Sequence, residues 1–187
     1  ALARTILALP LLAAVSPAVA ADDGPTIPGE FSANVALTTD YRFRGITQTS
    51  DNPAIQGGFD YSIGVAEGVG LYAGVWASSV DFSDGDQAQV EIDYYGGVTF
   101  DIKGIGVDIG LIYYSYPGAS SGLNYDFVEG KIDLSYSPME SLTLGVGYNY
   151  SPDYFGSSGH YHYPHASVEF TPDLGLPLPV TLSASYG

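Results

Sequence analysis

The sequence contains no cysteine and very few basic residues. Of its 187 residues only 5 are Lys or Arg, whereas 21 are Asp or Glu, which gives a formal net charge of −16. Without cysteine the chain has neither disulfide bonds nor thiolate metal sites. The excess of negative charge repels phosphate backbones and no cluster of Lys or Arg offsets it, so nucleic-acid binding is excluded.

The chain also lacks an apolar run long enough to cross a bilayer as a helix. The run from Ile6 to Val15 falls short of the roughly 20 apolar residues that such a helix needs. Arg4 before this run and the small residues Ala18-Val19-Ala20 after it are typical of a secretory signal peptide and its cleavage site. We therefore predict a signal peptide over residues 1–20 and export of the chain; a transmembrane anchor is the alternative.

An alternation of apolar and polar residues recurs from residue 31 almost to the end of the chain, and no window has a helical apolar period. Successive side chains of a strand point to opposite faces, so the pattern predicts strands. The apolar face of the first strand extends to Tyr41 and Phe43. In segment 69–82 either set of alternating residues could form the apolar face. In segment 107–114 the alternation is weak, with Val107, Ile109, Leu111 and Tyr113 opposite Asp108. Strands are predicted at about 31–44, 54–66, 69–82, 89–102, 107–114, 128–136, 142–150, 165–170 and 180–186.

The connections between these strands alternate in length. Longer segments rich in Gly, Ser, Asp and Asn alternate with turns. The longer segments are 46–52, 83–87, 117–124 and 151–159; the tight turns are 67–68, 103–104 and 138–140, and a looser turn is expected at 173–178. Bacterial outer-membrane barrels have short periplasmic turns and long extracellular loops, whereas a β-sandwich has no reason for this alternation.

The predicted fold is therefore all-β, a transmembrane antiparallel up-and-down β-barrel over residues 31–187, preceded by a short linker at 21–30. Closure is required because an open sheet edge in hydrocarbon leaves unpaired backbone groups, each costing several kcal/mol. The apolar faces would contact lipid, and the charged faces would line the interior. A soluble secreted β-sandwich, with the apolar faces turned inward, is the alternative.

Several segments resemble a known family. They are NVALTTDYRFRG (34–45), ITQT (46–49), PAIQGGFDY (53–61), LYAGVWAS (71–78) and EIDYYG (91–96). These segments resemble the TorF family of proposed bacterial outer-membrane porins, and the likeness extends from about residue 33 to the end of the chain. It implies an outer-membrane β-barrel of a Gram-negative bacterium with a transport function.

The C-terminal end departs from that family. Barrels of this kind finish on a strand that ends in an aromatic residue, whereas this chain ends at Gly187. Since bacterial single-chain barrels have an even number of strands, the predicted nine strands imply a C-terminally truncated sequence that lacks at least one strand. The resemblance implies about ten to twelve strands in the full-length protein. Ala1 in place of Met leads us to expect missing residues at the other end as well.

Charged residues on the polar strand faces are the candidate pore lining. Asp40, Arg42 and Arg44 alternate on one predicted strand and so project to the same side. They either form the positive wall of a constriction that faces carboxylates of other strands, or fill the interior as an ion-pair network. The candidate set is Asp40, Arg42, Arg44, Asp60, Glu91, Asp93, Asp101, Glu129, Lys131, Asp133 and Glu169.

No metal, cofactor or catalytic site is predicted. His160 and His162 share a predicted strand face, but His165 has the opposite parity and no carboxylate stands at ligand spacing. The loop 83–86 lacks the ligand set of a calcium-binding loop. No Ser-His-carboxylate set can be assembled from the spacing of these residues, so the chain is not expected to be an enzyme. A lipid-modifying barrel enzyme, with a site assembled from several strands, is the alternative.

These patterns together predict a bacterial outer-membrane porin for passive diffusion of small hydrophilic solutes. An acidic interior would make it prefer cations. The expected partners are outer-membrane lipid and small solutes or ions; the sequence fixes neither the solute nor the oligomeric state. The alternative function is a non-conducting structural or adhesion barrel that binds partners through its extracellular loops.

Overall fold

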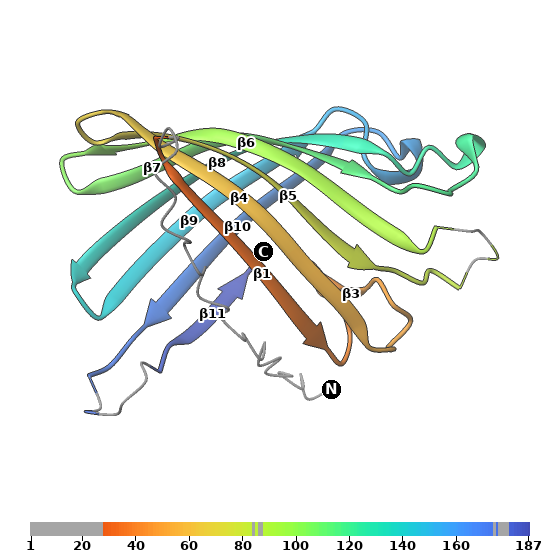
Figure 1. The fold of residues 1–187 in the computed structure, drawn as a ribbon, viewed down its shortest axis with the longest axis horizontal. Helices are drawn as coiled ribbons and strands as arrows, with labels where there is room; N and C mark the ends of the chain where they lie inside the picture. Colours follow the sequence, from red (N-terminus) through yellow and green to blue (C-terminus); the bar gives the residue numbers. More distant parts are fainter. Residues whose placement is uncertain (1–27, 84, 86–87, 174, 176–179) are drawn as a thin grey trace, which may run out of the picture.

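A computed structural model describes residues 28–187, except residues 84, 86–87, 174 and 176–179. The chain is all-β and forms a nine-stranded antiparallel sheet in the order β1-β4-β5-β6-β7-β8-β9-β10-β11. Figure 1 shows this sheet strongly twisted and curved. The strands are β1 (Glu30–Thr38), β4 (Ala54–Ala66), β5 (Val69–Ser79), β6 (Val90–Ile102), β7 (Ile105–Ser115), β8 (Phe127–Met139), β9 (Leu142–Ser151), β10 (Tyr161–Phe170) and β11 (Leu182–Tyr186).

Each strand of the sheet pairs with its neighbours along the chain, as in an up-and-down meander. β1 and β11 lie at the two edges, and the described residues contain no pairing between them, so the sheet is not closed. A separate two-stranded ribbon joins β2 (Arg42–Phe43) to β3 (Ile46–Thr47). The longer connections also contain the short 3-10 helices η1 (Ser121–Leu123) and η2 (Phe155–Ser157).

No helix in the part of the chain that the structure describes has the length and hydropathy needed to cross a membrane.

The nine predicted strands are confirmed, and short and long connections alternate from β1 to β10. The connection between β10 and β11, at 171–181, is longer than the looser turn expected there. The predicted signal peptide at 1–20, and the linker up to residue 27, lie outside the described residues. Two boundaries were wrong by four residues or more: β10 begins at Tyr161 instead of 165, and β1 ends at Thr38 instead of 44.

Hydrogen bonds around Asp40 explain the early end of β1. Its carboxylate accepts hydrogen bonds from the hydroxyls of Thr47 at 2.6 Å and Thr49 at 3.0 Å, which draws the chain out of the sheet. Arg44 and Gly45 then adopt positive φ angles of 49° and 82° in the turn of the β2–β3 ribbon. The alternation of the sequence continues through this segment, but the strand does not.

The strand register separates the sheet into an inner face, which carries Glu91, Asp93 and Glu129, and an outer face. Residues directly opposite one another share a face. Asp93 lies opposite Trp76 and Tyr114, so these two aromatic residues are on the inner face. This settles the two segments in which the alternation was ambiguous or weak, 69–82 and 107–114: their even-numbered residues face inward and their odd-numbered residues outward.

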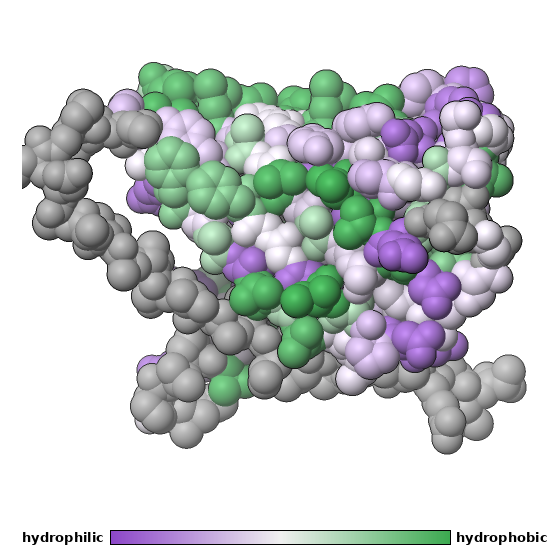
Figure 2. Space-filling view, turned by 45° about the vertical axis from the view of Figure 1, so that its right-hand side comes forward, coloured by the Kyte–Doolittle hydropathy of each residue, from purple (hydrophilic) through white to green (hydrophobic). Residues whose placement is uncertain are grey.

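The outer face is apolar and open to the surroundings. Leu37 is 71% exposed and Leu111 64% exposed, and they belong to a large set of exposed apolar residues on the same face. Figure 2 shows such side chains as green patches over the sheet, with hydrophilic side chains gathered at the right of the view. By contrast, Glu91 and Glu129 on the inner face are 1% and 0% exposed. This distribution is the reverse of that in a water-soluble domain.

Glycines of the inner face leave room for tyrosine rings that lie across neighbouring strands. A Cβ added to Gly74 would come within 2.6 Å of the Tyr95 ring. One added to Gly97 would stand 2.5 Å from both the Ile109 carbonyl oxygen and the Tyr72 hydroxyl. These close approaches require glycine at both positions.

Gly97→Ala should therefore destabilise the fold by about 1–3 kcal/mol, the usual cost of forcing a methyl group into filled space. Gly64→Ala is the matched control, because an added Cβ there meets nothing within 4 Å. Urea unfolding gives the free energy of unfolding of both variants. Equal stabilities would contradict the packing of Tyr72 against Gly97.

Candidate functional site

The interior at the end of the sheet that carries the long connections is filled by aromatic side chains. Figure 1 places these connections together, at the right of the view. We call the cluster the aromatic plug; its buried members are Val80, Ala88, Tyr114, Tyr116 and Phe127, and Tyr41, Phe43, Phe82, Ile112, Ala119, Tyr125, Tyr154 and Phe155 pack against them. The plug joins the connection after β1 to those after β5, β7 and β9.

Ring contacts hold the plug together. The Phe82 ring lies 5.7 Å from Tyr116 and 5.5 Å from each of Tyr125 and Phe155. These are tilted and edge-on contacts, in which the positive edge of one ring meets the negative face of another. Phe43 lies 5.7 Å from Tyr114 and so ties the β2–β3 ribbon to the inner face of the sheet. The placement of Tyr41 and Phe43 on an outward, lipid-facing strand was wrong, because the chain leaves the sheet after Thr38.

A buried ion pair connects the ribbon to the inner face. The two guanidinium nitrogens of Arg44 donate to the two carboxylate oxygens of Glu129 on β8 at 2.7 and 2.6 Å. The Arg44 guanidinium also lies 4.2 Å from the centre of the Tyr163 ring on β10. Burial works against the charge of Arg44, but the hydrogen bonds with Glu129 outweigh it and hold its pKa above the usual range.

Burial has a related effect on the phenols of the plug that lie outside the strands. It raises the pKa of Tyr154 to about 12 and that of Tyr41 well above its ordinary value, the neighbouring charge of Glu91 adding to the effect on Tyr41. These phenols are therefore neutral hydrogen-bond donors at physiological pH. Tyr41 donates to Glu91 at 2.7 Å.

Asp40 and Arg42 form a local ion pair instead of a wall across the interior. Arg42 lies 2.6 Å from Asp40 and 2.5 Å from Asp51, and its side chain is 44% exposed. Hydrogen bonds from Thr47 and Thr49 and the charge of Arg42 hold the pKa of Asp40 below its usual range against the effect of desolvation. The prediction that Asp40, Arg42 and Arg44 share one strand face was wrong, because the chain leaves the sheet after Thr38.

The other candidate residues lie on strands of the inner face. Lys131 contacts Asp108 at 2.6 Å and Asp133 at 3.3 Å, and Asp133 also contacts His165 at 3.0 Å. Together with Arg44 and Glu129 these groups form ion-pair networks of the kind proposed as the alternative to a charged constriction. The candidates outside these ion pairs are Asp60, Glu91, Asp93, Asp101 and Glu169. Asp60 accepts a hydrogen bond from the hydroxyl of Tyr95.

Sequence reasoning missed two parts of this interior. His165 was left out of the candidate set, although its parity had separated it from the other histidines. The aromatic plug was missed as well; its only signal was bulky aromatic residues, such as Tyr125 and Phe155, within loops otherwise rich in Gly and Ser.

The histidines are divided between the two faces. His160 and His162 lie beside the hydroxyls of Tyr150 at 2.7 Å and Tyr148 at 2.5 Å. His162 pairs with Tyr150 on the outer face, whereas His165 lies on the inner face. Within the described residues no group of three or more His, Cys, Asp or Glu side chains could hold a metal ion.

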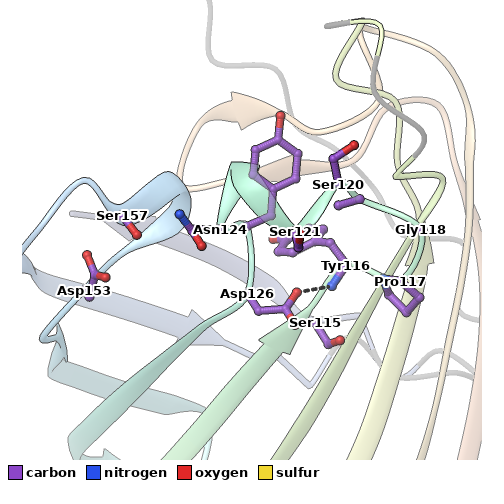
Figure 3. Close-up of a pocket in the computed structure, with 12 residues that line it drawn as sticks. Ser115, Tyr116, Pro117, Gly118, Ser120, Ser121, Asn124, Asp126, Asp153 and Ser157 are labelled. Atoms are coloured by element: carbon purple, nitrogen blue, oxygen red, sulfur yellow. Dashed lines mark hydrogen bonds between the residues drawn. The ribbon is translucent and has the colours of Figure 1, made fainter.

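Two cavities accompany the plug. The first, of about 500 Å³, lies among the long connections, and Figure 3 shows Ser115, Tyr116, Asp126, Asp153 and Ser157 around it. Its carboxylate Asp126 already accepts hydrogen bonds from the backbone nitrogen of Tyr116 at 2.8 Å and the hydroxyl of Tyr113 at 2.8 Å. The second cavity, of about 590 Å³, lies on the inner face and borders the plug at Tyr41 and Tyr114. We call it the lumen cavity.

Removal of Arg44 should destabilise the fold strongly, since it leaves Glu129 as an unpaired charge that is 0% exposed. Arg44→Leu is expected to cost about 3–5 kcal/mol in the free energy of unfolding. Arg42→Leu is the matched control and should cost at most about 1 kcal/mol, because Arg42 and Asp51 are 44% and 71% exposed, and Asp40 keeps its hydrogen bonds from Thr47 and Thr49. If urea unfolding gives equal losses for the two variants, the buried pair is not the contact that fixes the ribbon.

Comparison with known proteins places the chain in a family. None of the curated proteins matches the sequence. A family model described as "Bacterial protein of unknown function (Gcw_chp)" matches residues 22–187, which is most of the chain. The chain therefore belongs to the Gcw_chp family of bacterial proteins.

Proposed function

We propose that the chain forms an outer-membrane β-barrel whose polar interior admits small hydrophilic solutes, with a preference for cations. The observation that carries the proposal is the inverted distribution of side chains: apolar residues are exposed on the outer face, and Glu91, Asp93 and Glu129 are buried on the inner face. In lipid the outer residues would be in their preferred surroundings, and the charged residues would be shielded from hydrocarbon.

The dimensions of the strands support a membrane location. A tilted transmembrane strand needs about 9–11 residues. The strands from β4 to β10 contain between 10 and 13 residues. In the proposed barrel the edges β1 and β11 are joined directly or through further strands, because unpaired edge groups in hydrocarbon cost several kcal/mol each.

The charges of the inner face support the preference for cations. Carboxylates outnumber the basic groups Arg44 and Lys131 on this face; they are Asp60, Glu91, Asp93, Asp101, Asp108, Glu129, Asp133 and Glu169. Carboxylates in a low-dielectric wall concentrate cations and repel anions. The resemblance to the TorF family agrees with a transport role.

The aromatic plug favours a second candidate function. Its rings occupy the interior at the end with the long connections. A barrel that stays closed there would not conduct, and would act through its loops or its inner face.

Ion conduction in planar bilayers distinguishes the two functions. If the chain forms an open pore, reversal potentials across a salt gradient should indicate a preference for cations. This preference should weaken at higher salt concentration, because salt screens the carboxylates of the inner face. Asp101→Asn combined with Glu169→Gln should reduce the preference, because these carboxylates are exposed on the inner face. Arg42→Ala is the control and should change it little. An anion preference, or no conductance above that of lipid alone, would reject the open pore.

A lipid-facing position should not tolerate a charge. Val98→Arg is expected to cost about 2–4 kcal/mol if Val98 lies near the bilayer midplane, whereas Thr99→Arg on the inner face should cost far less. The free energy of folding into lipid vesicles measures the difference between these adjacent positions. Equal costs would contradict the membrane location.

A further inference from the structure

The lumen cavity is rich in aromatic rings. Tyr72 and Trp76 of β5, Tyr95 of β6 and Tyr114 of β7 line it, and Tyr41 from the connection after β1 closes it on the side of the plug. The Tyr41 and Trp76 rings meet edge-on at 5.3 Å. Its volume of about 590 Å³ falls within the usual range for small-molecule sites.

One carboxylate of this cavity is buried without a partner. Asp93 is 8% exposed and lies on β6 between Trp76 and Tyr114 of the adjacent strands. Its Oδ1 atom has no hydrogen-bond partner among the described residues. Glu91 lies two residues away on the same strand face and is also acidic, so it cannot compensate the charge of Asp93. The charged form of a buried carboxyl group is costly in such surroundings unless a cation approaches it.

The basic groups Arg44 and Lys131 of the interior are engaged elsewhere. Arg44 binds both carboxylate oxygens of Glu129. Lys131 also lines the lumen cavity, but its ammonium group contacts Asp108 at 2.6 Å and Asp133 at 3.3 Å. Asp93 is thus the carboxylate of this cavity that the described basic side chains leave uncompensated.

We infer that the lumen cavity binds a small organic ammonium ion, with its charge against Asp93 and its alkyl groups against Trp76 and Tyr95. Aromatic faces attract such cations, Trp most strongly, and rings around a quaternary ammonium group are a recurring recognition mode. Anions would be repelled by Asp93, and a neutral solute would leave its charge uncompensated. The inference rests on the proposed function in that the cavity faces the interior of the proposed barrel.

Trp76 provides a direct measurement, because it is the only Trp of the chain. Choline is titrated into the full chain in detergent while the Trp fluorescence is recorded. We expect a saturable change with choline and none with 3,3-dimethylbutan-1-ol, its neutral analogue of the same shape. Asp93→Asn should weaken choline binding by roughly tenfold or more, because it removes a desolvated charge partner.

Asp101→Asn is the matched control. Asp101 lies on the same strand and face as Asp93 and its loss changes the net charge equally, but it is outside the cavity and accepts its hydrogen bond from the backbone nitrogen of Gly104. This variant should bind choline as the parent does. Trp76→Phe, followed by titration calorimetry, is a second variant that should weaken binding by reducing the cation–π attraction.

Equal responses to choline and its neutral analogue would overturn the inference. So would undiminished choline binding by both Asp93→Asn and Trp76→Phe. Choline binding that depends on Asp93 in a barrel without conductance would support the site and reject the proposed pore. Conductance with cation preference but no choline binding would support the pore and reject the site.

Discussion

The buried ion pair between Arg44 and Glu129 is the constraint on which the interior depends. A carboxylate that is 0% exposed must have a partner, because its desolvation otherwise costs several kcal/mol. Here that partner comes from a loop 85 residues away in the sequence. The pair therefore holds the β2–β3 ribbon inside the curve of the sheet, where Phe43 meets Tyr114 and the aromatic plug is completed.

Tyrosine takes over much of the role that basic residues have in other polar interiors. The chain has 16 Tyr but only 5 Lys and Arg for 21 acidic residues. Phenol hydroxyls accordingly donate to carboxylates: Tyr41 to Glu91, Tyr72 to Asp108 and Tyr95 to Asp60. These bonds stabilise buried acids without adding positive charge, so the interior stays acidic while most of its carboxylates are satisfied. The glycines opposite the rings give them the space to lie across the strands.

The sequence predicted the sheet better than it predicted the interior. Alternation locates strands because the period of 2 follows from backbone geometry, and it placed β4 at 54–66 as observed. The same pattern misled between Thr38 and Arg44, where hydrogen bonds from Thr47 and Thr49 to Asp40 override it. These bonds depend on how the chain folds back, which alternation does not encode.

The interior pairings were harder to predict, because they depend on register. Asp108 lies on a strand whose alternation is weak, because Ile112 and Tyr114 share its face, and the alternation did not identify Lys131 as its partner. Arg44 and Glu129 meet only after the first loop has folded across the sheet. Charge, spacing and parity identify which residues face inward, but not which of them pair.

The position of the plug makes the two ends of the interior unequal. Rings fill the end with the long connections, whereas Thr99 and Asp101 are exposed toward the tight turns. In the proposed barrel, a solute arriving from the turn side would reach Asp93 without moving any loop, while one arriving from the loop side would first have to separate Phe43 from Tyr114. Exchange would therefore be fast from one compartment and slow from the other, with the rate on the slow side set by the unfolding of a loop and not by the width of a channel.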